Sequence, residues 1–377
     1  MTKKRWPDLP AFAPPQATSA TDRLTITGLR AWRLKEPVSG RRYTVVKLES
    51  RGGTIGFGEG AQIHGSDIAE AKTAVVGRRS TETEFIRHAL DRIPAMEAAV
   101  TNAMLDLTSR STNVPIYQFL GGPTRYKARV LAHLEGETDE ALSAALLLSK
   151  ALGFKAFAFP VPARDALWRM QVYVDAIRKR FETLKATGGA DTDYVLDGRE
   201  SLTPGDASFI ATSLERSHLI FLDEPTTVLT NDALSRISDE SVMPLGLGRN
   251  LHDVATFQNL LRWGCVDILR PSVGLNSIPK IRRMAAVAET RYVAVGPHHS
   301  GGPIGTLSAI HLAASLPNFY IQHVPQPAAE QDRAMRAELT SGNRETAVDG
   351  FAQLINKPGL GLDVNEQVLN KYSEETI

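Results

Sequence analysis

The sequence predicts an α/β protein in which a parallel-stranded barrel follows a smaller N-terminal α+β domain. Early in the chain, residues 44–49 and 55–59 alternate apolar and polar side chains around a turn at 51–54, as an antiparallel hairpin would. From Lys127 onward, eight short apolar runs recur at intervals of about 20 to 40 residues, with helical segments between them. Parallel strands need such crossover connections, and eight of them suit a closed barrel better than an open sheet.

Helical periodicity after the hairpin indicates three helices in the N-terminal domain, over residues 68–76, 85–93 and 95–109. The last of these is expected to end before Pro115, and the segment that follows is expected to stop at Gly121 and Gly122.

The eight predicted barrel strands are residues 129–134, 156–161, 194–197, 219–224, 243–248, 266–271, 292–297 and 319–323. Helices are expected between them, for example over 163–187 and 278–289. A C-terminal piece, not a full closing helix, is expected after the last strand, so the fold predicted is a modified TIM (β/α)7β-type barrel. The predicted division is a flexible tail (1–23), an α+β capping domain (24–126), the barrel (127–345) and a C-terminal segment (346–377) that returns to the capping domain.

Composition narrows the class of function. The 377 residues carry 43 lysines and arginines against 42 aspartates and glutamates, so charge gives no reason to expect a nucleic-acid or membrane partner. No run approaches the roughly 18 apolar residues that span a bilayer, and no apolar signal region follows the basic start. The single cysteine, Cys265, excludes an internal disulfide. A soluble, cytoplasmic protein with a small-molecule partner is expected.

Polar residues gather where the predicted strands end, which in a barrel is the mouth that holds active sites. Any one of them is explained by a solvated loop or a helix cap, but together they favour a site. They are His133, Glu135, Asp197, Arg199, Glu224, Arg249, Ser272, His298, His299 and His323.

Several local motifs carry a family resemblance. They include Gly53-Thr-Ile-Gly-Phe-Gly-Glu59, Pro115-Ile-Tyr-Gln-Phe-Leu-Gly-Gly122, Asp223-Glu224-Pro225, Gly296-Pro-His-His-Ser-Gly-Gly-Pro-Ile304 and Lys357-Pro-Gly-Leu-Gly-Leu362. In this order and spacing the chain resembles the enolase superfamily, in particular the mandelate racemase and muconate-lactonizing group and its acid-sugar dehydratases. The resemblance implies a carboxylate substrate bound on Mg²⁺, removal of the proton α to the carboxylate, and a homo-oligomer.

Carried over by position, the resemblance places the first two metal ligands on Asp197 and Glu224. The third carboxylate is replaced by Arg249, which in one interpretation pairs with Asp197 and Glu224 in place of the metal and leaves a degenerate Mg²⁺ site. In the other, a metal is retained by Asp197, Glu224 and a neighbour such as Asp223, although strand alternation turns Asp223 away from the side of Glu224. The base of strand seven falls on His298, and its usual aspartate partner falls on Ser272. The frequent lysine of strand two falls on Ala158, and an acid of strand eight falls on His323.

Two hypotheses follow. In the first, the chain is a lyase or isomerase that dehydrates or epimerises an acid sugar, with His298, His299 or His323 as acid or base. In the second, it is a catalytically altered, metal-free homologue that binds an anionic ligand through Arg199 and Arg249, or that runs different chemistry. Further candidates for substrate binding are His64, Arg42, His299 and Ser272. Arg41, the neighbour of Arg42 before the first hairpin strand, is an equal candidate to meet a substrate carboxylate.

Overall fold

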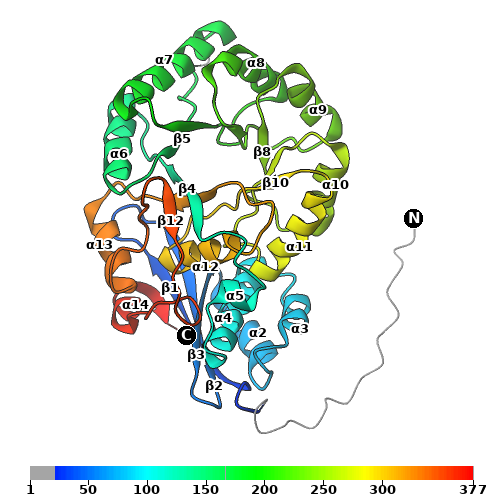
Figure 1. Ribbon diagram of the computed structural model, residues 1–377, viewed down its shortest axis with the longest axis vertical. Helices are drawn as coiled ribbons and strands as arrows, with labels where there is room; N and C mark the ends of the chain where they lie inside the picture. The colour runs from blue at the N-terminus through cyan, green and yellow to red at the C-terminus, as the bar shows by residue number, and fades with distance from the viewer. Residues whose placement is uncertain (1–21, 166, 377) are drawn as a thin grey trace.

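A computed structural model describes residues 22–165 and 167–376, and it has two parts (Figure 1). The tail expected over 1–23 lies outside the described residues except for its last two. None of the described helices is long and apolar enough to cross a membrane.

The N-terminal part is built on a four-stranded antiparallel sheet in the order β13-β1-β2-β3. The predicted hairpin is confirmed as β2 (Arg42–Ser50) and β3 (Ile55–Ala61), with Val45 opposite Glu59. The three expected helices are α2 (Gly65–Val75), α3 (Thr83–Ala89) and α4 (Pro94–Ser111), followed by the short α5 (Ile116–Phe119). The sheet also contains β1 (Ile26–Lys35), which the sequence analysis did not predict.

A row of glycines on β3 decides how this sheet meets α4. A Cβ atom at Gly56, Gly58 or Gly60 would lie 2.0–2.3 Å from a backbone oxygen of α4, and for Gly58 that oxygen belongs to Ala99. Only glycine therefore allows the helix to lie this close to the strand. Neighbouring residues on a strand point to opposite faces, so Glu59 points away from α4 and toward the barrel. There its carboxylate accepts hydrogen bonds from the backbone N–H groups of Gly302 and Gly305.

The second part is the barrel, and its eight predicted strands are confirmed in the described residues. In chain order they are β4 (Lys127–His133), β5 (Ala156–Pro160), β6 (Asp193–Asp197), β7 (Leu222–Asp223), β8 (Leu245–Leu247), β9 (Ile268–Leu269), β10 (Ala294–Val295) and β11 (Gln322–Pro325). Neighbours along the path β10-β9-β8-β7-β6-β5-β4-β11 pair in parallel. The two ends join through hydrogen bonds such as Tyr320 N to Val295 O, at 2.8 Å.

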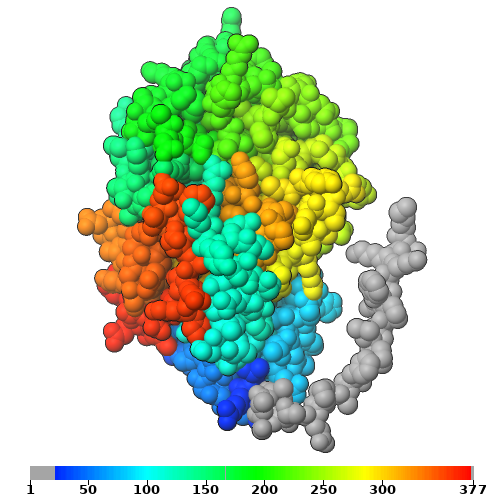
Figure 2. Space-filling view, in the orientation of Figure 1, coloured from blue at the N-terminus to red at the C-terminus, as the bar shows by residue number. Residues whose placement is uncertain are grey.

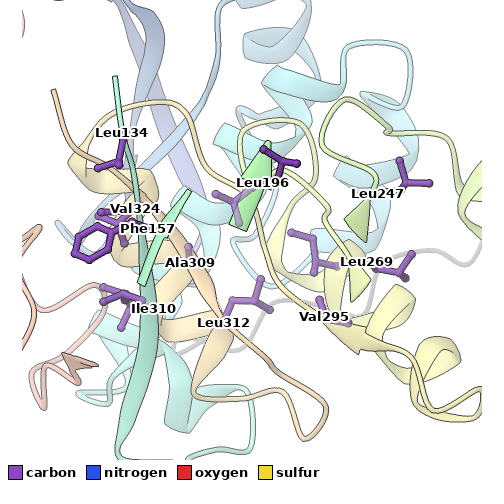
Figure 3. Packing of buried hydrophobic residues seen from close by; sticks show 14 of the residues in the cluster. Leu134, Phe157, Leu196, Leu247, Leu269, Val295, Ala309, Ile310, Leu312 and Val324 are labelled. Atoms are coloured by element: carbon purple, nitrogen blue, oxygen red, sulfur yellow. The ribbon is translucent and has the colours of Figure 1, made fainter. Parts of the chain in front are cut away.

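Helices surround these strands, as expected for parallel connections (Figure 1). They are α6 (Asp139–Ala151), α7 (Met170–Gly188), α8 (Pro204–Leu214), α9 (Asn231–Glu240), α10 (Val254–Trp263), α11 (Ile278–Glu289) and α12 (Pro303–Ala313). Figure 3 shows buried residues of successive strands, including Leu196, Leu247 and Leu269, together with Ala309 and Leu312 of α12.

The chain after β11 differs in detail from the expectation. A ten-residue helix, α13 (Glu330–Leu339), follows β11, and β12 (Phe351–Gln353) then pairs antiparallel with β4. The next segment runs beside α5, where Ile116 N donates to Gly359 O, and Figure 2 shows the two side by side. The chain continues through α14 (Glu366–Tyr372) into β13 (Ser373–Thr376), which pairs with β1. The exact domain boundaries stay a prediction.

Candidate functional site

A cavity of about 280 Å³ lies at the carboxyl ends of the barrel strands. Residues at the end of β4, on β11, and directly after β8 and β10 line it, and the N-terminal part contributes one residue from the turn before β2. The lining residues are Arg41, His133, Glu135, Arg249, Asn250, His298, Ser300, His323 and Pro325. The strand ends therefore meet in one site, as the barrel predicts.

Arg249 connects the carboxylates of this site. Its Nη1 atom lies 3.2 Å from Asp197 Oδ2, and its Nη2 atom lies 2.7 Å from Asp223 Oδ2. Glu224 contacts it differently, because Glu224 Oε1 accepts from the backbone N–H of Arg249 at 2.6 Å. The interpretation in which the Arg249 side chain pairs with Asp197 and Glu224 is therefore correct for Asp197 and wrong for Glu224, because the second side-chain partner is Asp223.

Arg270 is the residue that sequence reasoning missed, and it pairs with Asp223, which was considered only as a substitute metal ligand. Asp223 is almost fully buried inside the barrel, where Arg270 holds it with Nε at 3.0 Å and Nη2 at 3.2 Å. Arg270 also donates to Gly296 O at 2.6 Å and is itself fully buried. Strand alternation correctly turned Asp223 away from Glu224, but it gave no reason to expect a second arginine inside. An arginine closing the apolar run at 266–271 was the available signal.

The pKa values of the neighbouring acids Asp223 and Glu224 are shifted in opposite directions. Burial, and then the adjacent Asp223, raise the pKa of Glu224 to about 8. Burial also opposes the ionised form of Asp223, but Arg270 and Arg249 outweigh it and lower the pKa of Asp223. Asp197, Asp223, Arg249 and Arg270 thus form two buried opposite-charge pairs whose formal charges cancel.

The residues present do not fit the Mg²⁺ ion that the family resemblance implies. The guanidinium of Arg249 lies against the Asp197 carboxylate, where a cation would have to bind, and it would repel that cation. Within residues 22–165 and 167–376, no three histidine, cysteine, aspartate or glutamate side chains are grouped so as to hold a metal ion. A divalent ion with hard oxygen ligands therefore has no complete donor set here.

Three imidazoles form one wall of the cavity. The rings of His298 and His323 stack with centroids 4.5 Å apart, and His133 meets His323 edge-on at 5.4 Å. His323 Nδ1 bonds to the carbonyl oxygen of His299, which only accepts, so Nδ1 carries the proton and Nε2 is left as an acceptor. Nε2 of His323 and Nδ1 of His298 are buried without a hydrogen-bond partner in the described part of the chain.

These histidines are neutral in the folded protein near pH 7. Burial lowers the pKa of His298 well below its ordinary value, and the neighbouring His323 and Arg249 add to the effect. Burial likewise lowers the pKa of His323, helped by His133. Because a neutral imidazole has a free lone pair, this wall of the cavity offers proton acceptors.

Of the two neighbouring candidates Arg41 and Arg42, the N-terminal part contributes Arg41 to the cavity. Arg41 reaches the cavity and pairs with Glu135, and its buried Nη1 has no hydrogen-bond partner among the described residues. Arg42 lies one position further on the pleated strand and pairs instead with Glu374, 2.9 Å away, outside the cavity. The one-residue alternation of a strand accounts for the difference.

Other predicted residues also lie outside the cavity. Arg199 has a left-handed backbone (φ 55°), and its exposed side chain pairs with Glu137, so it does not join Arg249. His64 is the exposed N-cap residue of α2. His299 is buried against Gly302 O at 2.7 Å and Glu59 at 3.4 Å, and Ser272 Oγ accepts from Gly274 N at 3.3 Å.

Two dehydratases of known name are similar to this chain over most of its length. A D-mannonate dehydratase of Caulobacter vibrioides is 26% identical over 377 aligned positions, which cover 88% of this chain and 92% of that protein. A D-galactonate dehydratase of Xanthomonas campestris pv. campestris is 24% identical over 358 positions, covering 88% and 91%.

Solved structures share the fold. A mandelate racemase/muconate lactonizing enzyme from a Sulfitobacter species superposes with a TM-score of 0.83 at 20% identity, covering 93% of this chain and 96% of that one. The family model described as enolase C-terminal domain-like matches residues 141–368, which is more than half of the chain. The chain belongs to the enolase superfamily.

Proposed function

We propose that the chain is an acid-sugar dehydratase, acting on a hydroxylated carboxylic acid in the cavity at the barrel mouth. The observation that carries the proposal is the pairing, in one cavity, of neutral imidazoles with buried arginine donors. The arginines suit a carboxylate, and the imidazoles suit the proton next to it. Relatives across nearly the whole chain are named mannonate and galactonate dehydratases, which supports the same substrate class.

His298 is the proposed base. In the step proposed, the bond between hydrogen and the α-carbon breaks, the proton goes to the His298 imidazole, and the electron pair moves toward the carboxylate. The bond between the β-carbon and its hydroxyl oxygen then breaks as the carbon–carbon double bond forms, and the hydroxyl leaves as water with that proton. The enol that remains tautomerises to a keto acid, so the balance is the loss of one water. Arg249 faces the negative charge that develops on the carboxylate.

The placement of the histidines favours dehydration over epimerisation. His133 lies on β4, His298 in the segment after β10, and His323 on β11, and these elements are neighbours at the closure of the barrel. Epimerisation needs a proton removed on one face of the substrate and returned on the other. On β5 the position of the family's lysine is Ala158, buried in the barrel interior, which has no group for that second face.

A panel of acid sugars that includes D-mannonate and D-galactonate tests the proposal. The protein is incubated with each acid in D₂O, and two quantities are measured. One is keto-acid formation, with deuterium entering at the carbon that lost its hydroxyl, and the other is exchange of the α-hydrogen of the unreacted acid for deuterium. We expect keto acid from at least one panel member, reduced at least 100-fold in His298→Asn and unchanged in Arg199→Met, whose side chain lies outside the cavity. A fully active His298→Asn protein would refute the assignment of the base.

The second hypothesis, an anion-binding homologue without turnover, rests on Arg249 standing among the carboxylates where a metal ligand is expected. It is separated by the same panel. Acids that raise the melting temperature while forming no product and taking up no deuterium would favour binding alone.

A further inference from the structure

We infer that Arg249 is a built-in cation that takes the place of the divalent metal ion, and that the site binds its carboxylate ligand without one. This inference rests on the proposed function for the identity of the ligand, but the position of Arg249 is independent of it.

The guanidinium of Arg249 lies among the acids at the strand ends. Arg249 directly contacts the acids at the ends of two neighbouring strands, through Asp197 on β6 and Asp223 on β7. Its own backbone N–H occupies Glu224 Oε1. The two acids that resemblance assigns as metal ligands, Asp197 and Glu224, are therefore both engaged by one residue.

The strand-end acids also have hydrogen-bond partners besides the Arg249 side chain. Asp223 is held from its other side by the fully buried Arg270, which also donates to the Gly296 carbonyl. Asp197 receives a second hydrogen bond from the backbone N–H of Arg199 at 2.9 Å. Because these acids already have donors of opposite charge, they do not require an ion for neutrality.

Arg249 also has one N–H donor, Nε, that is left for a ligand. Its Nε atom is buried and has no hydrogen-bond partner among the described residues, while the residue lines the cavity. A buried N–H without a partner costs free energy unless a ligand satisfies it. The Nη1 atom of Arg41, on the N-terminal side of the cavity, also lacks a hydrogen-bond partner among the described residues and lies 4.0 Å from Glu36 Oε2. A ligand carboxylate that reaches Arg249 Nε would satisfy that donor.

In this site a guanidinium performs two tasks of a bound cation. Its fixed charge faces the carboxylate, and its hydrogen bonds hold the strand-end acids in place. Unlike an ion, it cannot be removed by a chelator. The ligand is thus expected to bind equally well in the presence and absence of Mg²⁺.

Calorimetric titration with MgCl₂ alone tests the position of Arg249 without any substrate. We expect no saturable binding to the wild-type protein or to Arg216→Glu, which makes the same charge change at an exposed site in the 3-10 turn after α8. We expect Arg249→Glu to bind one Mg²⁺ per chain, because it supplies a third carboxylate. Should Arg249→Glu not fold, Arg249→Asp offers the same group on a shorter side chain.

Stoichiometric Mg²⁺ binding by the wild-type protein would overturn the inference, and so would a folded Arg249→Glu protein that binds none. A second titration uses L-malate, a small hydroxy acid, in EDTA. Binding that weakens at least tenfold in Arg249→Gln supports the role of the free donor, and unchanged binding contradicts it. A failure of the acid-sugar panel alone would count against the proposed reaction and leave the Mg²⁺ result standing.

Discussion

Replacing Arg249 with methionine is the most informative single perturbation of the buried charges. Methionine keeps the aliphatic stem and removes the guanidinium, so Asp197 loses its arginine partner and retains the Arg199 backbone N–H and a His133 nitrogen 3.8 Å away. Asp223 keeps both bonds to Arg270. Removing one partner of a buried pair typically costs about 3–5 kcal/mol. Because only Asp197 is left without an arginine, we expect a loss near the lower end, about 3 kcal/mol.

Urea unfolding followed by tryptophan fluorescence measures this loss as the difference in the free energy of unfolding. The control is Arg199→Met, which removes an exposed ion pair and should cost at most about 1 kcal/mol. Adding Asp197→Asn to Arg249→Met should recover part of the stability, because it removes the unpaired charge. If Arg249→Met were as stable as Arg199→Met, the guanidinium would not be neutralising buried acids, and the description of the site would be wrong.

Three further predictions concern the catalytic wall and the sheet. His323→Asn is expected to lower turnover at least tenfold without abolishing binding of the acid sugar, as a comparison of kcat with KM would show; a pure KM effect would contradict its place beside the base. In the folded protein the pKa values of His298 and His323 lie below those in the unfolded chain. Below about pH 6.5 the unfolded chain therefore binds more protons than the folded one, and the free energy of unfolding decreases as the pH is lowered. The double variant with glutamine at both positions should therefore show a shallower loss of unfolding free energy between pH 6.5 and 5, and an equal slope would exclude these residues as its source. Gly58→Ala should destabilise by about 1–3 kcal/mol or more, since its Cβ would lie 2.0 Å from the Ala99 oxygen, whereas Gly28→Ala, with 3.6 Å to its nearest neighbour, should not; equal midpoints in urea would contradict the packing argument.

Much of the fold was predictable because its signals are local and periodic. The hairpin at 44–59 and the eight apolar runs of the barrel follow from alternation and spacing. The strand β1 escaped prediction because Arg30, Arg33 and Lys35 interrupt its apolar residues, and its burial depends on sheet partners that are distant in sequence, β2 and β13. The helix α13 is strongly polar and is held by tertiary contacts, including that of Asp332 with the backbone of Val38 at 2.8 Å.

The site was predictable in position but only partly in its contacts. The rule that barrel strands end at the active-site mouth correctly brought together His298, His323 and Arg249. It could not show which neighbouring residue on a strand or turn faces the cavity, and for this reason it did not decide between Arg41 and Arg42. Nor could it show that Arg270 fills the barrel interior, since side-chain pairing across strands is a property of the closed barrel and not of any local pattern.

Keto-acid formation catalysed by the wild-type protein in EDTA tests the central claim most directly. The acid sugars of the panel are incubated in D₂O with excess chelator, and keto acid carrying deuterium at the carbon that lost its hydroxyl is followed with and without added Mg²⁺. Proton abstraction by His298 beside Arg249 predicts that the deuterated keto acid forms at the same rate in both conditions. Keto acid that forms only after Mg²⁺ is added would contradict it.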